Sequence, residues 1–178
     1  MLLADARAQI AHYCSRITSD GLVVGTAGNI SIRDGDHVAI TPSGLPYELT
    51  TPELVCVVSY ADGRQVDGDL QPASELALHL AALRTTGLGA IVHTHSNAAT
   101  AVASLDGVTE LPPFHYYVAM FGGPIPVTEY ATYGTELLAA RVSAALADRT
   151  GCLLGQHGAV AAGTDLDQAY DKALILEW

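Results

Sequence analysis

The chain has 178 residues, 49% of them hydrophobic, and a formal net charge of −11 at pH 7. This length is sufficient for one domain with a substantial core, and the acidic charge argues against nucleic acid or an anionic membrane surface as a partner. No apolar run approaches the roughly 20 residues that would span a bilayer. The three cysteines are scattered and lack metal-motif spacing, which favours a reduced, cytoplasmic protein.

Helices and strand hairpins alternate along the chain. In chain order we expect a helix at 3–19, strands at 29–33 and 37–41, strands at 55–60 and 64–66, a helix at 74–84, a strand at 90–95, helices at 98–103 and 135–147, strands at 152–154 and 159–162, and a helix from 164 onward. Residues 111–123 show no clear pattern. This mixture predicts α/β layers around a sheet with much antiparallel pairing. The last helix reaches Trp178 without a stop signal, so we expect one domain over residues 1–178 with a natural C-terminal tail beyond it.

Two histidines lie one residue apart where an apolar strand ends. His93 and His95 follow Ala90-Ile91-Val92, and residues i and i+2 of a strand point to the same face. His157 lies downstream between glutamine and glycine. Three imidazoles could hold one metal ion and leave a fourth position for substrate. Hydrogen-bonded core histidines would also fit the pattern, but a strand-to-helix corner is a common place for catalytic residues.

Two loops combine glycine with hydroxyl or amide side chains. They are Gly25-Thr26-Ala27-Gly28-Asn29 and Thr41-Pro42-Ser43-Gly44. Glycine allows close approach of the backbone to a ligand, and successive N–H groups can bind an anion. By themselves these loops fit ordinary turns better, because glycine, serine and asparagine dominate turns. No Gly-Lys-Ser/Thr phosphate loop occurs.

The segment Pro72-Ala73-Ser74-Glu75 opens the predicted helix at 74–84. Ser74 is typical of an N-cap, and Glu75 would interact favourably with the helix dipole. A functional interpretation makes Glu75 a carboxylate directed at the metal site, able to bind the ion or to move protons. His79 shares a helix face with Glu75, and we interpret it as a packed or hydrogen-bonded neighbour of the site and not as a ligand.

Tyrosines cluster in the second half of the chain, in His115-Tyr116-Tyr117 and around Tyr130 and Tyr133. Most tyrosines are half-buried packing groups. One of these could act as a general acid near a metal, and the residues by themselves do not choose which.

These motifs, in this order, resemble the class II aldolase/adducin family, specifically its L-fuculose-1-phosphate aldolase branch. The segments that carry the resemblance span nearly the whole chain: 25–30, 40–47, 72–75, 92–95, 115–117, 130–135 and 156–158. The resemblance implies a single domain with a central, mainly antiparallel sheet flanked by helical layers. It also implies a homo-oligomer, a C4-type tetramer, with active sites between subunits.

The family's functional residues carry over onto matching positions here. The resemblance implies one Zn²⁺ or other divalent ion per subunit, with the ligands His93, His95, His157 and, without substrate, Glu75. Glu75 would be the acid/base, Tyr116 would serve a neighbouring subunit's site, and Tyr133 would place the aldehyde. The phosphate site would comprise Thr26, Gly28, Asn29, Ser43, Gly44 and Ser74.

The implied reaction is cleavage of a ketose 1-phosphate, such as L-fuculose 1-phosphate, to dihydroxyacetone phosphate and a short aldehyde such as L-lactaldehyde. The chain departs from the family at Ala73, where a serine is common, and at Tyr133, where fuculose aldolases often have phenylalanine. Alternatives are a sugar-phosphate epimerase, an oxo-tetronate phosphate decarboxylase, a zinc hydrolase or a non-catalytic adducin-like module. The retained histidines and Glu75 disfavour the last.

Overall fold

A single sheet of nine strands runs through the computed structural model, which describes all 178 residues. The strand order is β4-β3-β2-β1-β5-β9-β8-β7-β6, and only β7 and β8 pair in parallel. The strands are β1 (Asn29–Asp34), β2 (His37–Ile40), β3 (Cys56–Ser59), β4 (Gln65–Asp67), β5 (Ala90–Thr94), β6 (Glu110–Leu111), β7 (Ile125–Thr128), β8 (Gly151–Leu154) and β9 (Gly158–Gly163). The predicted mainly antiparallel sheet is therefore confirmed.

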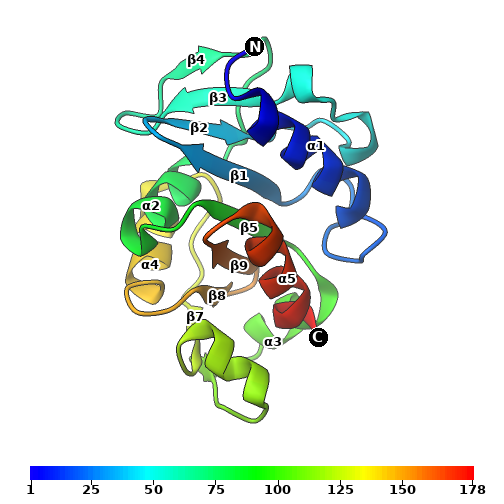
Figure 1. Cartoon of the computed structure of the whole chain (residues 1–178). Helices are drawn as coiled ribbons and strands as arrows, with labels where there is room; N and C mark the ends of the chain where they lie inside the picture. The colour runs from blue at the N-terminus through cyan, green and yellow to red at the C-terminus, as the bar shows by residue number, and fades with distance from the viewer.

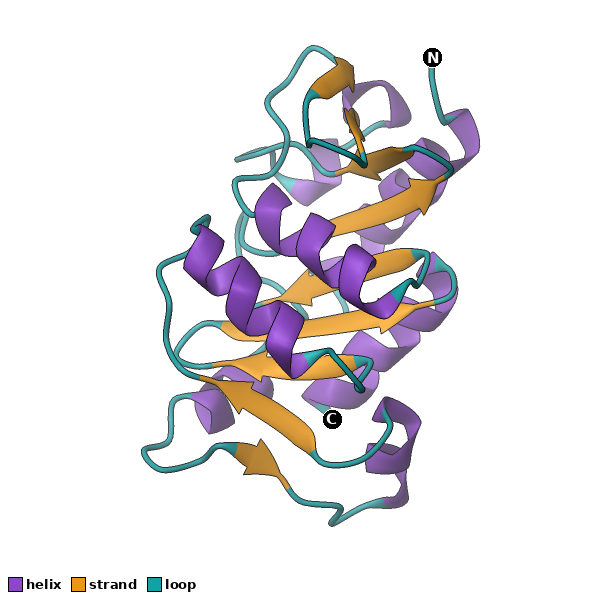
Figure 2. Ribbon diagram, turned by 90° about the vertical axis from the view of Figure 1, so that its left-hand side faces the viewer, coloured by secondary structure: helices purple, strands orange, loops and turns teal.

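Helices cover both faces of this sheet. They are α1 (Ala4–Ile17), α2 (Leu76–Thr86), α3 (Asn97–Ala103), α4 (Glu136–Ala145) and α5 (Leu166–Glu177), with short 3₁₀ turns η1 (Tyr47–Leu49), η2 (Pro52–Leu54) and η3 (Tyr116–Phe121). Figure 2 shows α2 and α4 side by side on one face, and α1 and α5 lie on the other. The layered arrangement expected from the mixture of hairpins and helices is confirmed (Figure 1).

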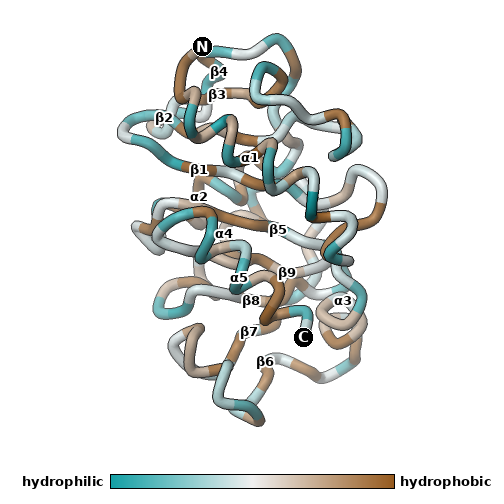
Figure 3. The backbone as a smooth tube through the Cα atoms, turned by 45° about the vertical axis from the view of Figure 1, so that its right-hand side comes forward, coloured by the Kyte–Doolittle hydropathy of each residue, from teal (hydrophilic) through white to brown (hydrophobic).

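The sheet separates two hydrophobic cores because successive side chains of a strand point to opposite faces. In β2, Val38 and Ile40 belong to the core that includes α2 and α4, whereas Ala39 belongs to the core that includes α1 and α5. Figure 3 shows hydrophobic stretches along the central strands. Strands β5 and β9 lie at the centre of the sheet, and every residue in them is buried. Because both faces are covered, these strands carry runs of apolar residues and do not alternate with polar ones.

Two predicted helix caps are wrong by one residue. Ser74 is not the N-cap of α2: Glu75 occupies that position, and its side chain makes no capping hydrogen bond. The N-cap of α5 is Asp165 and not Thr164, since the Asp165 carboxylate accepts from the backbone N–H of Gln168. At the other end of α2, Gly87 adopts the left-handed conformation expected of a helix stop.

The region without a clear sequence pattern, 111–123, contains the end of β6 and the 3₁₀ turn η3. Strand β7, which follows it, was not expected from the sequence. Pro126 lies inside that strand and lowers its apparent strand propensity. No helix in the structure has the length and apolar character that crossing a membrane requires.

The sheet register brings three chain segments to one edge. Asn29 at the start of β1 pairs with His93 near the end of β5, and Thr94 at the end of β5 pairs with Ala159 at the start of β9. The antiparallel order therefore places the loop before β1, the corner after β5 and the loop before β9 beside one another. The first turn of α2 completes this group, because Glu75 contacts His93.

Candidate metal centre and active site

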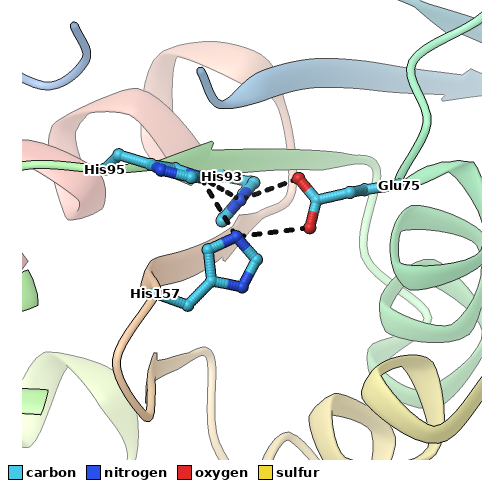
Figure 4. Close-up of side chains that lie close together, drawn as sticks. All are labelled: Glu75, His93, His95 and His157. Atoms are coloured by element: carbon cyan, nitrogen blue, oxygen red, sulfur yellow. Dashed lines mark hydrogen bonds and ion pairs between the residues drawn. The ribbon is translucent and has the colours of Figure 1, made fainter. Parts of the chain in front are cut away.

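Four side chains from this edge converge on one point (Figure 4). Each of Glu75, His93, His95 and His157 offers one ligand atom, and these atoms all lie within 4.8 Å of one another. The Nε2 atom of His95 is 3.0 Å from Nε2 of His93 and 3.1 Å from Nε2 of His157. The Oε2 atom of Glu75 lies 3.0 Å from His93 Nε2, and its Oε1 atom lies 3.4 Å from His157 Nε2. The structure thus brings together all four predicted metal ligands.

The donor set suits a divalent cation. The Nδ1 atom of His93 lies 2.9 Å from the carbonyl oxygen of Ala159, and a carbonyl only accepts, so Nδ1 carries a proton and Nε2 faces the cluster. Burial opposes a charge on this ring, but the Glu75 carboxylate, 3.0 Å from Nε2, raises the pKa of His93, so that without a cation Nε2 is protonated as well. A divalent cation would replace that second proton. Burial and the charge of His93 lower the pKa values of His95 and His157 to about 3 and about 4, which keeps both neutral near pH 7. Lone pairs converging with a carboxylate are the donors that zinc prefers.

Glu75 is a buried carboxylate, 4% exposed. Burial raises its pKa, but the charge of protonated His93 and hydrogen bonds from His93 and Asn29 outweigh burial, so the net pKa lies well below its usual range. Its Oε1 atom has no hydrogen-bond partner. A buried, ionised oxygen left free in this way is available to a cation or to a proton on a ligand.

A cavity of about 340 Å³ opens beside these ligands. Of the predicted site residues, it is lined by Thr26, Gly28, Asn29, Ser74, Glu75, His95, Tyr133 and His157. The backbone N–H groups of Thr26, Gly28 and Ser74 make no backbone hydrogen bond, so they can donate to an anion. The cavity therefore joins a cation-binding cluster to neutral anion donors.

Besides His93, which is fully buried, three predicted residues do not line this cavity. Ser43 and Gly44 are exposed, and the backbone N–H of Ser43 already donates to the Gln71 carbonyl at 2.9 Å. Tyr116 is 73% exposed on η3 and stacks with its neighbours His115 and Tyr117. Within one chain, the structure leaves these residues apart from the metal cluster.

Two further polar residues of the cavity, Tyr130 and Gln156, had no role assigned from the sequence. Tyr130 lies in the segment 130–135 and Gln156 in the segment 156–158, both of which carry the family resemblance. Gln156 has a left-handed backbone with φ of 55°, which is uncommon for a residue other than glycine. That conformation turns the chain sharply before His157, and no sequence signal short of the fold indicates it.

Known proteins resemble this chain in both sequence and fold. The family model for the class II aldolase and adducin N-terminal domain matches residues 8–178. The 5-deoxy-D-ribulose 1-phosphate aldolase of Bacillus thuringiensis is 39% identical over 181 residues, covering 100% of this chain and 84% of the relative. The L-fuculose phosphate aldolase of Escherichia coli K12 is 39% identical over 163 residues, covering 90% and 74%.

A solved structure of an L-fuculose 1-phosphate aldolase superposes with a TM-score of 0.91 at 34% identity, covering 97% of this chain and 82% of that one. The chain belongs to the class II aldolase/adducin family.

Proposed function

We propose that this protein is a divalent metal-dependent aldolase that cleaves a ketose 1-phosphate to dihydroxyacetone phosphate and a short aldehyde. The observation that carries the proposal is the convergence of three imidazoles and the Glu75 carboxylate at a cavity that also presents free backbone N–H groups. L-fuculose 1-phosphate, which would release L-lactaldehyde, and 5-deoxyribulose 1-phosphate, which would release acetaldehyde, are the first substrates to test. Both fit the names of the similar proteins.

His93, His95 and His157 would hold Zn²⁺ or another divalent transition metal, one per subunit, with Glu75 as a ligand when substrate is absent. A bound cation supplies Lewis-acid stabilisation of the negative charge that develops on the substrate's carbonyl and neighbouring oxygens. Elsewhere in the cavity, Thr26, Gly28, Asn29 and Ser74 would seat the phosphate through neutral donors. We further propose that Ser43 and Gly44 complete the phosphate site.

Bond cleavage separates substrate carbons 3 and 4. A base removes the proton from the hydroxyl on carbon 4, which becomes the aldehyde carbonyl, and the electron pair of the broken bond passes to carbon 3 as an enediolate. Glu75, which takes up a proton from solvent when substrate enters, then delivers that proton to carbon 3 and completes dihydroxyacetone phosphate. The base returns its proton to solvent, so the proton count balances. A buried carboxylate with one free oxygen, Oε1, fits this role. Tyr133, a cavity residue, would position the aldehyde.

Tyr116 would act as the hydroxyl base in a neighbouring subunit's site, so that the active protein is a homo-oligomer, a C4 tetramer in our proposal. Support comes from the segment that carries it: Phe114, Tyr116 and Met120 are 71%, 73% and 48% exposed. Large apolar side chains gathered on one surface are typical of a protein–protein contact.

A panel of phosphorylated ketoses, assayed for aldehyde release with and without added zinc, tests the proposed function. We expect cleavage of at least one 1-phosphate of a deoxyketose, and no cleavage after chelation. Epimerisation or carbon dioxide release from the same panel, with no aldehyde, would instead assign the protein to another reaction of the family.

A further inference from the structure

A chain of buried hydrogen bonds leads from the sheet to the Glu75 carboxylate. Ser31 Oγ lies 2.6 Å from His79 Nδ1, His79 Nε2 lies 2.5 Å from Asn29 Oδ1, and Asn29 Nδ2 donates to Glu75 Oε2 at 3.2 Å. Ser31 and His79 have no exposed surface, and Asn29 is 5% exposed. Nothing in the proposed reaction uses Ser31 or His79, yet both are polar and fully removed from water.

The Glu75 carboxylate, at the end of this series of hydrogen bonds, determines which atom donates in each of them. An ionised carboxylate only accepts, so the amide nitrogen of Asn29 faces Glu75 and its oxygen faces His79. The Asn29 oxygen then needs a donor, which is the Nε2 hydrogen of His79. A neutral imidazole with a proton on Nε2 accepts at Nδ1, so the Ser31 hydroxyl donates there. All three hydrogen bonds point towards Glu75.

The fold builds this chain from two elements. Asn29 and Ser31 are two residues apart on β1 and share a face of the sheet. His79 lies one helical turn after Glu75 on α2, which packs on that same face. Burial lowers the pKa of His79 to about 3, so the imidazole remains neutral at physiological pH and keeps one donor and one acceptor.

We propose that His79 is a positioning residue that fixes the Asn29 amide, and through it the Oε2 atom of Glu75, so that Oε1 is the oxygen that exchanges a proton with the substrate carbon. This inference rests on the proposed aldolase function. Without the His79 donor, the Asn29 amide could rotate and turn its oxygen towards the carboxylate, which would repel it. Glu75 would then lose the hydrogen bond that holds one of its two oxygens in place.

A pair of substitutions at one position separates hydrogen bonding from packing. His79→Gln keeps one donor for Asn29 and one acceptor for Ser31, whereas His79→Leu fills the space and offers neither. We expect kcat of metal-loaded His79→Leu to fall by about 10- to 100-fold, the usual effect of removing such a supporting partner, with little change in KM. His79→Gln should retain most of the wild-type kcat.

A second readout is independent of turnover. In the metal-loaded protein, the Asn29 side-chain NH₂ hydrogens should exchange slowly with solvent in nuclear magnetic resonance spectra of the wild type and of His79→Gln. They should exchange faster, or shift, in His79→Leu. Metal content and melting temperature are measured for each variant, so that loss of the ion or of the fold is recognised.

Each result decides the inference. Wild-type kcat in folded, metal-loaded His79→Leu would overturn it, and so would an equal loss of kcat in both variants that simply follows their melting temperatures. If His79→Leu does not fold, His79→Met takes its place, because it also fills the space and donates no hydrogen bond to Asn29. An unchanged kcat in His79→Met would also overturn it. A wild-type protein that cleaves no ketose phosphate contradicts the proposed function instead, and the slow amide exchange would still report on the hydrogen-bond chain.

Discussion

A Cβ atom at Gly28 would lie 2.7 Å from the carbonyl oxygen of His93, one of the four residues of the Glu75–histidine cluster. Gly28 also has a φ of 78°, in the region that glycine tolerates best. The loop before β1 therefore reaches the metal cluster only because this position has no side chain. Gly28 also lines the cavity, and its N–H donates to no backbone acceptor.

Gly28→Ala should cost more stability than Gly25→Ala. Gly25 has a similar φ of 64° but open space around its Cβ position, so both variants share a left-handed penalty of about 1–2 kcal/mol. The clash at Gly28 should add about 1–3 kcal/mol, as overpacking does. Urea unfolding measures the difference between the two variants, and equal stabilities would show that the loop relaxes away from His93.

Removing His157 should remove the metal. The ion would keep only His93, His95 and Glu75, and His157 supplies the donor from the opposite loop. We expect His157→Ala protein to contain much less than one divalent ion per chain by elemental analysis. His12→Ala, a change of an exposed helix histidine, is the matched control and should retain the ion. Full occupancy in His157→Ala would exclude His157 as a ligand.

The clustering of Glu75 with the three histidines could be predicted because its chemistry is local or carried by short motifs. His93 and His95 share a strand end, and that spacing is visible in the sequence. The meeting of His95 with His157, 62 residues later, depends on β9 pairing with β5. The sequence contains no local signal for that pairing, and only the resemblance to a family indicated it.

Features that depend on packing between elements were missed or misplaced. Glu75 is the N-cap residue of α2, but its side chain contacts His93 and makes no capping hydrogen bond. A capping rule based on neighbouring residues does not anticipate this contact. The hydrogen-bond partners of His79 are set by how α2 lies on β1. The sequence predicted only that His79 supports the site, and the structure agrees.

Alkaline pH should reduce stability partly through Tyr13. Its hydroxyl donates to Asp167 at 2.6 Å, and burial together with this carboxylate raises the pKa of Tyr13 to about 12. The folded state then holds a proton that the unfolded chain loses near pH 10, so the stabilisation is complete below about pH 10 and is lost between about pH 10 and 12. Tyr13→Phe has no hydroxyl and therefore lacks this pH-dependent stabilisation. Urea titrations across this range should show the advantage of wild type over Tyr13→Phe shrinking as pH rises, and a constant difference would contradict the assignment.

Mixing inactive subunits tests whether Tyr116 serves a neighbouring site. Tyr116→Phe and Glu75→Gln proteins should each be nearly inactive alone. In mixed oligomers, an interface that joins one intact Tyr116 to one intact Glu75 has a complete site, so some activity should return. Mass spectrometry of the intact assembly confirms that mixing occurred. No recovery from confirmed mixed oligomers would mean that both residues serve the same chain or that Tyr116 is not required.

The sharpest prediction concerns the proton that Glu75 is proposed to move. Dihydroxyacetone phosphate alone should exchange one hydrogen of its hydroxymethyl carbon with heavy water in the presence of the wild-type enzyme, a partial reaction that needs no aldehyde and no Tyr116. Glu75→Gln keeps the shape of the side chain and removes the base. The exchange rate, followed by nuclear magnetic resonance, should fall by roughly two to four orders of magnitude, the range for a lost general base.

The controls for this prediction separate catalysis from support of the fold. Because Glu75 also lies within reach of the ion, metal content is measured in the same samples, and only metal-replete protein counts. If Glu75 acted only through the dipole of α2, Glu75→Gln would cost on the order of 1 kcal/mol of stability or less and leave the exchange intact. The Tyr116→Phe protein is the positive control, since it should lose cleavage but keep the exchange. Wild-type exchange by metal-replete Glu75→Gln protein would show that another group moves this proton.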